Sequence, residues 1–268
     1  GTVGLPGGAH GSSPVNEKPT AEQMTEWMAE LNVAGIAAVQ KGMLYRTDNS
    51  YIVDAVALFS DRMRAVIIVD PGAAETPAMV RALASRGVVA IRFFGVGVED
   101  KAAWLTSPQA LSVWALAYEL GLHVDIEAPV VGAAALAPTV EAMADRFPDL
   151  SIVLDHLFMP VLTDPHHGID ESFAGLAARP NIFFKFTSIN LDFAREMSVD
   201  PAALLRRAVD VYGANRIMWG SDIGTSSGTY VEMIDRAVAA TSLLTDEERA
   251  TVLHHTGRRV FAAGTVGG

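Results

Sequence analysis

Ionisable side chains stand at the ends of several short apolar segments of this sequence. Asp222 ends the segment RIMWGSD, Asp155 and His156 lie near the end of SIVLDHL, and Glu127 lies near the end of LHVDIEAP. Carboxylates and histidine transfer protons in enzymes, so a site that combined them could do acid–base chemistry. A single aspartate or histidine in such a place usually forms a turn, caps a helix or packs in the core. Several of them at the ends of successive segments favour a shared polar pocket.

Two cations lie inside apolar segments and need a partner. Lys185 stands within FFKF, and Arg92 stands within AIRFF. Burial of an ammonium or guanidinium group without an opposite charge costs much free energy. Each cation therefore requires either a carboxylate of the protein or an anionic group of a substrate, and the sequence leaves both alternatives open. Either alternative adds the two cations to the same polar pocket.

The elements that must position these side chains alternate along the chain. Apolar segments typical of buried parallel strands lie near residues 35–40, 64–70, 88–94, 122–127, 151–157, 182–188 and 216–222, and helical segments separate them. Repeated strand–helix alternation is typical of a doubly wound sheet or a (β/α)8 barrel. Because the pattern predicts seven strands and not eight, we expect a TIM-like α/β barrel whose first strand is missing or replaced. In such a barrel the carboxyl ends of the strands meet at one mouth.

Composition and charge restrict the domain organisation and the partners. Residues 1–19 are rich in Gly, Pro and Ser and are expected to be irregular, and residues 20–268 are expected to form a single barrel domain. The formal net charge of −11 disfavours nucleic acid as a partner, and the lack of cysteine excludes disulfides and thiolate metal sites. No apolar stretch approaches the roughly 20 residues that cross a bilayer, and the start of the chain lacks the pattern of a signal peptide. We therefore expect a cytoplasmic protein that binds neither nucleic acid nor membrane.

Several segments resemble the amidohydrolase superfamily, in its amidohydrolase-2 type. SIVLDHLFMP is similar to the segment that carries a site histidine there, and YGANRIMWGSDIG is similar to the terminal strand that carries a site aspartate. TDNSYIVDAVALFSDRMRAVIIVDP and VVAIRFF resemble the branch that contains 2-pyrone-4,6-dicarboxylate hydrolase and sugar-lactone isomerases. The similarity extends from about residue 19 to the end of the chain.

The resemblance implies a distorted (β/α)8 barrel in which His156 and Asp222 are the catalytic residues and Asp222 is the general base. In metal-dependent members a divalent cation activates water. The sequence departs from the family because it has no His-x-His pair and because Glu127 stands where metal-binding members often have histidine. A catalytic zinc usually takes three protein ligands. We therefore favour a site without a cofactor, and a single zinc or manganese ion bound by His156, Asp222 and Glu127 stays the alternative.

Hydrolysis of a lactone that bears a carboxylate is the function that these residues and the resemblance favour. Asp222 would activate water and His156 would polarise the carbonyl, while Arg92 and Lys185 would bind the substrate carboxylate. The remaining residues expected to contact substrate are Glu127, Tyr45 and Asn190. Metal-dependent decarboxylation, lactone isomerisation and a non-catalytic barrel that binds a small acid are the alternatives. The expected partner is a small carboxylate molecule, and association into a homo-oligomer stays open.

Overall fold

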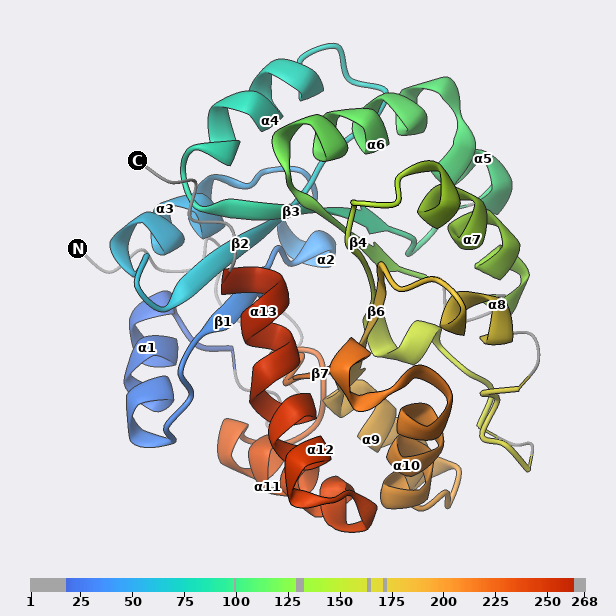
Figure 1. Cartoon of the computed structure of the whole chain (residues 1–268). Coiled ribbons are helices and arrows are strands. Elements are labelled where there is room, and N and C mark those ends of the chain that lie inside the picture. The colour runs from blue at the N-terminus through green and yellow to red at the C-terminus, as the bar shows by residue number, and fades with distance from the viewer. Residues whose placement is uncertain (1–17, 99, 129–132, 163–164, 171–172, 263–268) are drawn as a thin grey trace.

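Seven short strands form one parallel sheet, as the apolar segments predict (Figure 1). The computed structural model describes residues 18–98, 100–128, 133–162, 165–170 and 173–262, so nearly all of the segment predicted to be irregular lies outside the described residues. The strands are β1 (Ile36–Val39), β2 (Met63–Ile68), β3 (Val88–Phe94), β4 (His123–Glu127), β5 (Ile152–Leu154), β6 (Ile182–Thr187) and β7 (Ile217–Gly220). Each strand pairs with its neighbours in the sequence, and the sheet curls into an open barrel that has seven of the eight strands of a (β/α)8 barrel among the described residues.

Helices connect the strands and surround the sheet (Figure 1). They are α1 (Ala21–Glu30), α2 (Gly42–Tyr45), α3 (Ser50–Leu58), α4 (Thr76–Ala84), α5 (Lys101–Thr106), α6 (Pro108–Leu120), α7 (Ala137–Arg146), α8 (Ala174–Ala177), α9 (Ser188–Glu196), α10 (Pro201–Tyr212), α11 (Tyr230–Ala240), α12 (Asp246–Ala250) and α13 (Thr256–Ala262). None of the helices in the described ranges has the length and apolar character needed to cross a membrane.

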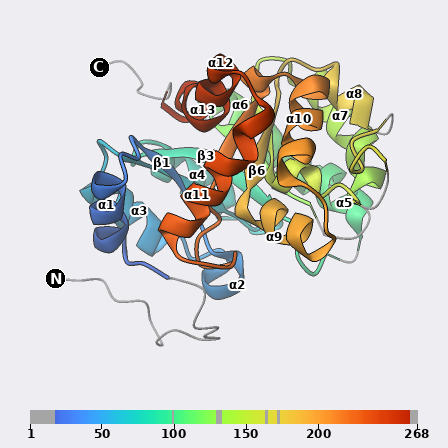
Figure 2. The ribbon, with the colours of Figure 1, turned by 90° about the horizontal axis from the view of Figure 1, so that it is seen from below.

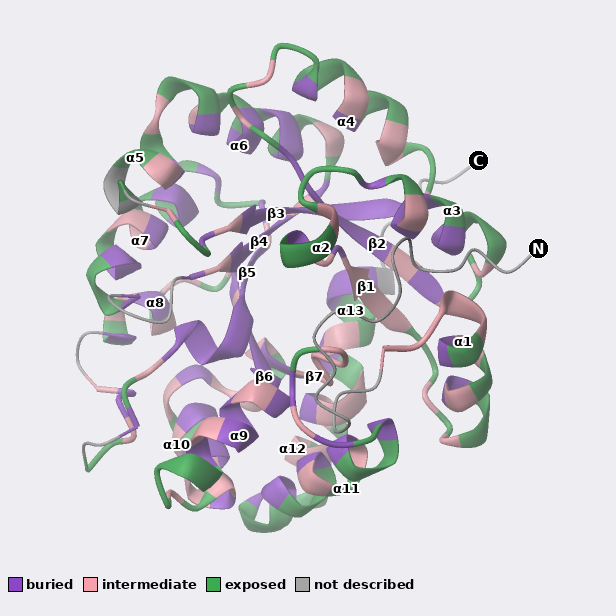
Figure 3. Cartoon of the chain, turned by 180° about the vertical axis from the view of Figure 1, so that it is seen from behind, coloured by how far each residue is buried: buried purple, intermediate pink, exposed green. Residues whose placement is uncertain are grey.

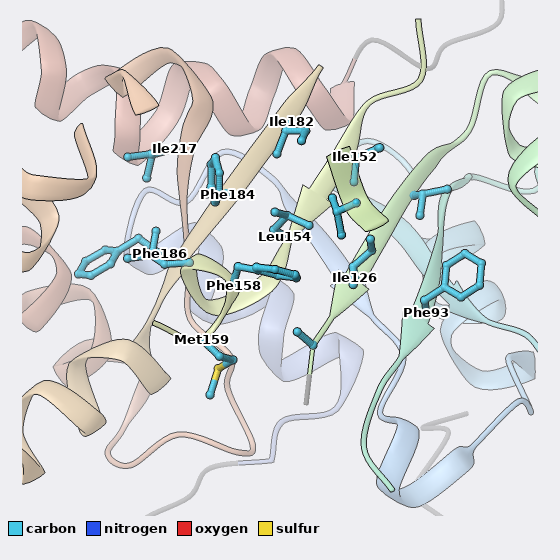
Figure 4. Close-up of a cluster of buried hydrophobic side chains, with 14 of the residues drawn as sticks. Phe93, Ile126, Ile152, Leu154, Phe158, Met159, Ile182, Phe184, Phe186 and Ile217 are labelled. Atoms are coloured by element: carbon cyan, nitrogen blue, oxygen red, sulfur yellow. The ribbon is translucent and has the colours of Figure 1, made fainter. Parts of the chain in front are cut away.

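Alternate side chains of each strand face opposite sides of the sheet. On β6, Ile182, Phe184 and Phe186 are buried on the side of the helices, and Figure 4 shows Phe184 near Leu154 of the neighbouring β5. The ring of Phe184 stacks on Tyr212 of α10 with the two ring centroids 3.8 Å apart. Burial of an apolar side chain of this size stabilises a fold by roughly 1.5–3 kcal/mol, so this outer layer fixes the strands against the helices.

The inner face of the sheet is closed at one end by α13. Val66, Val153 and Met218, from three different strands, pack against Val260 and Phe261 of this helix. Figure 1 shows α13 across one end of the strands, and the view from below in Figure 2 places α2 toward the opposite end. The amino ends of the strands therefore rest on an apolar plug, and their carboxyl ends open toward α2.

The sheet is open between its two edge strands. Within the described ranges, β1 pairs only with β2, and β7 pairs only with β6. The four residues of β1 are all half-buried, whereas the three residues of β5 are all buried. A side chain that spans this open side therefore joins parts of the sheet that no backbone hydrogen bond connects.

Candidate active site

A layer of charged side chains lies on the inner face of the sheet, on the carboxyl side of the apolar plug. Arg92 of β3 forms an ion pair with Asp155, which follows β5, and its Nη2 atom lies 3.0 Å from Oε2 of Glu127 on β4. Lys185 of β6 forms an ion pair with Asp125 of β4, and its Nζ atom lies 2.8 Å from Asp155 Oδ1. The interior of a barrel is usually filled by apolar side chains. The charged layer therefore indicates that the candidate active site lies at this end of the barrel.

The charges of this layer compensate one another away from water. Asp125, Asp155 and Lys185 are buried, with at most 6% of their surface exposed. Burial and the charge of Asp155 raise the pKa of Asp125 to about 6. Burial also acts on Asp155, but Arg92 and Lys185 hold the pKa of its carboxyl well below the usual range. Burial alone would lower the pKa of Lys185, yet Asp125 and Asp155 raise it, so the ammonium keeps its charge.

Arg92 and Lys185 thus have carboxylate partners within the protein, which is one of the two alternatives that the sequence leaves open. Their contact with a substrate carboxylate stays a prediction. Glu127, on the rim above them, is half-buried, and burial raises the pKa of its carboxyl to about 7. Glu127 can therefore gain or lose a proton near neutral pH.

The chain turns sharply after β5 and delivers two consecutive side chains to the same site. Leu154 ends the strand, and the four residues His156–Met159 have φ angles between 53° and 63°. This left-handed conformation costs roughly 1–2 kcal/mol for each residue that has a Cβ atom. In an extended strand Asp155 and His156 would point to opposite faces. The predicted strand near 151–157 is therefore shorter in the structure, and the turn lets both side chains enter the site.

His156 is held by hydrogen bonds to its ring and to its backbone. Its Nδ1 atom lies 2.7 Å from Oγ1 of Thr187, at the end of β6, and its carbonyl accepts a 2.9 Å hydrogen bond from Asn190 Nδ2. Oδ1 of Asn190 accepts a 3.0 Å hydrogen bond from the backbone N–H of Thr187. Burial lowers the pKa of His156, so the imidazole is neutral at pH 7. Asn190, which is predicted to contact substrate, thus positions the histidine.

Asp222 lies in the turn that follows β7. Its φ angle is 47°, and its Oδ2 accepts a 3.2 Å hydrogen bond from the hydroxyl of Ser226. The side chain is half-buried. Its charge contributes to the pKa shifts of both His156 and Glu127. His156 follows β5 and Asp222 follows β7 of the same parallel sheet, so both residues lie at its carboxyl end although they are far apart in the sequence.

Lys41 is a further charged residue at this mouth, and the sequence patterns do not single it out. It follows β1, and its ammonium donates a hydrogen bond to Oγ1 of Thr225, in the turn after β7. Burial lowers the pKa of Lys41, and the charges of Asp222, Arg92 and Glu127 also act on it. The signal that could have identified it is its place directly beyond an apolar strand, next to the buried Gln40.

The short helix α2 lies over the carboxyl ends of the strands (Figure 3). Gly42 packs on the ring of Phe94, and a Cβ atom at this position would come within 2.7 Å of that ring. Tyr45, which is predicted to contact substrate, stacks on Tyr51 with ring centroids 6.0 Å apart, and its hydroxyl is buried without a hydrogen-bond partner among the described residues. The absence of a side chain at Gly42 thus allows α2 to approach the sheet closely.

A cavity of about 460 Å³ lies beside the mouth, between α2 and the ends of β2 and β3. Its lining is mostly apolar, and its charged members are Arg46, Asp70 and Arg92. Arg92 also belongs to the charged layer, so the cavity adjoins the site through this side chain.

The donors at the mouth do not fit a metal ion. In the described part of the chain, no group of three His, Cys, Asp or Glu side chains is arranged to hold one. Arg92 engages Glu127, and Nδ1 of His156 contacts Thr187. We therefore derive no chemical step through a metal.

The fold and the site together define the class of protein. A parallel (β/α) barrel that carries ionisable side chains at the carboxyl ends of its strands has the arrangement of the barrel enzymes. Within that class, the family model described as Amidohydrolase matches residues 8–263, and the chain belongs to this family. The predicted superfamily is thereby confirmed.

Individual relatives are more distant. An L-fucono-1,5-lactonase from Burkholderia ambifaria is 32% identical over 89 residues, and this match spans only 32% of the chain and 30% of the relative. A probable 2-pyrone-4,6-dicarboxylic acid hydrolase from Acinetobacter baumannii, with citric acid bound, has a TM-score of 0.73 at 18% identity and covers 94% of each chain. An amidohydrolase from Burkholderia multivorans with bound zinc has a TM-score of 0.73 at 18% identity and covers 90% of this chain and 87% of its own. At such identities the two structures show a shared fold.

Proposed function

We propose that this protein hydrolyses a small lactone that carries a carboxylate group. The observation that supports this most is that His156 and Asp222 both follow strands of one parallel sheet at its carboxyl end, beside a buried layer of charges. Membership of the amidohydrolase family and the short match to a lactonase support the opening of a cyclic ester. The structural likeness to a protein described as a hydrolase of a pyrone dicarboxylic acid supports a substrate with a carboxylate.

Asp222 is the general base in this proposal. Its carboxylate is half-buried, and the described residues provide it with one side-chain hydrogen bond, from Ser226. The carboxylate can therefore accept a proton from a water molecule while the water oxygen bonds to the lactone carbonyl carbon. A positioned base of this kind contributes roughly 10²- to 10⁴-fold to the rate.

His156 polarises the carbonyl through its Nε2–H group. In the structure the hydroxyl of Thr187 donates to Oδ1 of Asn190 at 3.2 Å and lies 2.7 Å from Nδ1 of His156. In the proposed catalytic state the hydroxyl turns to Nδ1, while Oδ1 of Asn190 keeps the backbone N–H of Thr187. When the hydroxyl donates to Nδ1, the neutral ring carries its proton on Nε2. This tautomer donates a hydrogen bond to the oxyanion that forms when water adds to the carbonyl.

Glu127 completes the proton balance. When the ring C–O bond breaks, the leaving oxygen needs a proton, while Asp222 has gained one from water. With a pKa of about 7, part of the Glu127 population is protonated at neutral pH and can supply that proton. Transfer of a proton from Asp222 to Glu127, directly or through water, restores the site for the next turnover.

Activity on a panel of lactones, with and without a carboxylate, tests the proposal. We expect Asp222→Asn to lower kcat by roughly 10²- to 10⁴-fold without a change in melting temperature. Asp61→Asn is the matched control because Asp61 is an exposed aspartate that lies before β2, at the opposite, amino end of the strands. Near-normal turnover by Asp222→Asn would remove the proposed base, and hydrolysis that a chelator abolishes would replace the proposal by metal-dependent chemistry.

A further inference from the structure

The cations of the mouth differ in what they contact. Arg92 and Lys185 each form ion pairs with two carboxylates. The ammonium of Lys41 instead donates to the neutral hydroxyl of Thr225, and no carboxylate of the described residues lies within ion-pair distance of it. Among the described residues, Lys41 is therefore a cation at the mouth that forms no ion pair, although the charges of Asp222 and Glu127 act on it.

Lys41 lies close to the turn that carries the proposed base, Asp222. Lys41 follows β1 and Thr225 follows β7, so their hydrogen bond spans the open side of the sheet at the carboxyl end. Thr225 also donates its backbone N–H to the carbonyl of Asp222, at 3.2 Å. The ammonium thus lies against the turn that carries the proposed base.

The surroundings of Lys41 favour an anion. Its side chain is half-buried, and burial lowers the pKa of the ammonium because desolvation disfavours its charged form. An ammonium has three donors, and the hydroxyl of Thr225 uses one of them. A carboxylate that approached from the mouth could accept from the others and would restore the electrostatic stabilisation that the ammonium lost when it left bulk water.

We propose that Lys41 and Thr225 form a carboxylate-binding subsite between β1 and β7, which holds the anionic group of the substrate beside Asp222. This inference deepens the proposed function, because it names the group that selects a carboxylated lactone over a neutral one. The charged layer of Arg92, Asp155, Lys185 and Asp125 then serves as the fixed floor of the mouth.

Binding of glutarate, a dicarboxylate that has no lactone ring, tests the subsite without any reaction. Lys41→Met removes the charge and keeps most of the side-chain length, and Lys41→Arg keeps the charge. Because a hydrogen bond to a charged group contributes roughly 1.5–3 kcal/mol, we expect calorimetry to show glutarate binding about 10- to 100-fold weaker in Lys41→Met and largely retained in Lys41→Arg. Arg86→Met is the control for net charge, since Arg86 is exposed and pairs with Asp54 on the surface.

Kinetics on a carboxylated lactone and on a neutral lactone of the same ring size give the second readout. Lys41→Met should lower kcat/KM for the carboxylated lactone about 10- to 100-fold and leave the neutral one nearly unchanged. Equal losses on both lactones, or unaltered glutarate binding, would overturn the subsite. If the wild type opens neither lactone but binds glutarate through Lys41, the lactonase proposal fails and the subsite stands. If Asp222→Asn abolishes turnover but Lys41→Met alters neither kcat/KM nor glutarate binding, the lactonase proposal stands and the subsite fails.

Discussion

The inner face of the barrel has two layers that differ in chemistry although the same strands supply both. Ala90, Val153 and Phe183 belong to the apolar layer, which packs on α13. Two residues further along the same strands or directly beyond their ends stand Arg92, Asp155 and Lys185 of the charged layer. A step of two residues keeps a side chain on the same face and moves it by about 6.6 Å. The position of an inward side chain along its strand therefore decides whether it belongs to the apolar layer on α13 or to the charged layer at the mouth.

The two layers also touch each other. Nζ of Lys185 lies 5.7 Å from the centroid of the Phe261 ring, and the ring of His123 packs edge-on against the same phenylalanine. The apolar layer thus shields the lower side of the charged layer from water. This shielding strengthens each ion pair and also makes an unpaired charge in that layer costly.

Removal of one charge from the upper layer should have the largest effect on stability. Asp155→Asn leaves Arg92 and Lys185 with fewer negative partners in a buried place. Loss of one partner from a buried ion pair typically costs about 3–5 kcal/mol. We expect a loss of this size in the free energy of unfolding by urea, followed by circular dichroism. A loss below about 1 kcal/mol would mean that the layer is not held by its charges.

The pH dependence of that loss sharpens the assignment to Asp155. The pKa of its carboxyl is lowered in the folded protein, so its contribution to stability is fully present above its unfolded pKa of about 4. The contribution is lost progressively as the pH falls below that value. Between pH 5 and 7 the titration of Asp125, whose pKa the charge of Asp155 raises, also enters the difference in unfolding free energy between wild type and Asp155→Asn. Below about pH 4 the difference should shrink, and a difference that grew on acidification in that range would contradict this sign.

Truncation in the lower layer should reduce stability and spare the chemistry. Phe261→Ala removes the ring that closes the barrel floor, and such a substitution typically costs about 3 kcal/mol or more in a core. At a temperature where the variant stays folded, we expect glutarate binding within about threefold of wild type. A loss of binding as large as that of Lys41→Met would show that the two layers are not functionally separate.

Removal of a charge from the outer surface should have the smallest effect on stability, and it serves as the reference for the substitutions in the two inner layers. Arg81 forms an ion pair with Glu119, and about half of each side chain is exposed. Water already solvates both groups well, so surface pairs of this kind contribute little. Arg81→Ala should leave the urea midpoint unchanged within error. A clear shift would mean that removal of any charge destabilises the protein, so that burial would not explain the loss of stability in Asp155→Asn.

Much of this arrangement could be predicted because strand composition is a strong signal. The segment IFFKF, residues 182–186, is apolar except for one cation, so the strand, its burial and the need for a partner follow from the residues. Which carboxylates meet Lys185 depends on the register between strands, and the sequence alone does not state it.

Local sequence patterns do not give the backbone turn at His156 or the hydrogen-bond partner of Lys41. The left-handed turn at His156–Met159 contains no glycine, which is the usual sign of positive φ angles. The hydrogen bond between Lys41 and Thr225 forms only because β1 and β7 lie on opposite sides of one opening of the sheet. The two residues are 184 positions apart in the sequence. Interactions of this range depend on the complete fold.

The plug formed by α13 has a consequence for how the chain is made. Val260 and Phe261 emerge from the ribosome after all seven strands, and those strands have no other described helix in their inner apolar layer. During synthesis the inner apolar layer of the nascent sheet therefore stays uncovered until Val260 and Phe261 of α13 have been made. The apolar floor of the barrel is therefore completed only when α13 has been made, and termination shortly before Val260 would release a chain whose inner apolar layer is exposed to water.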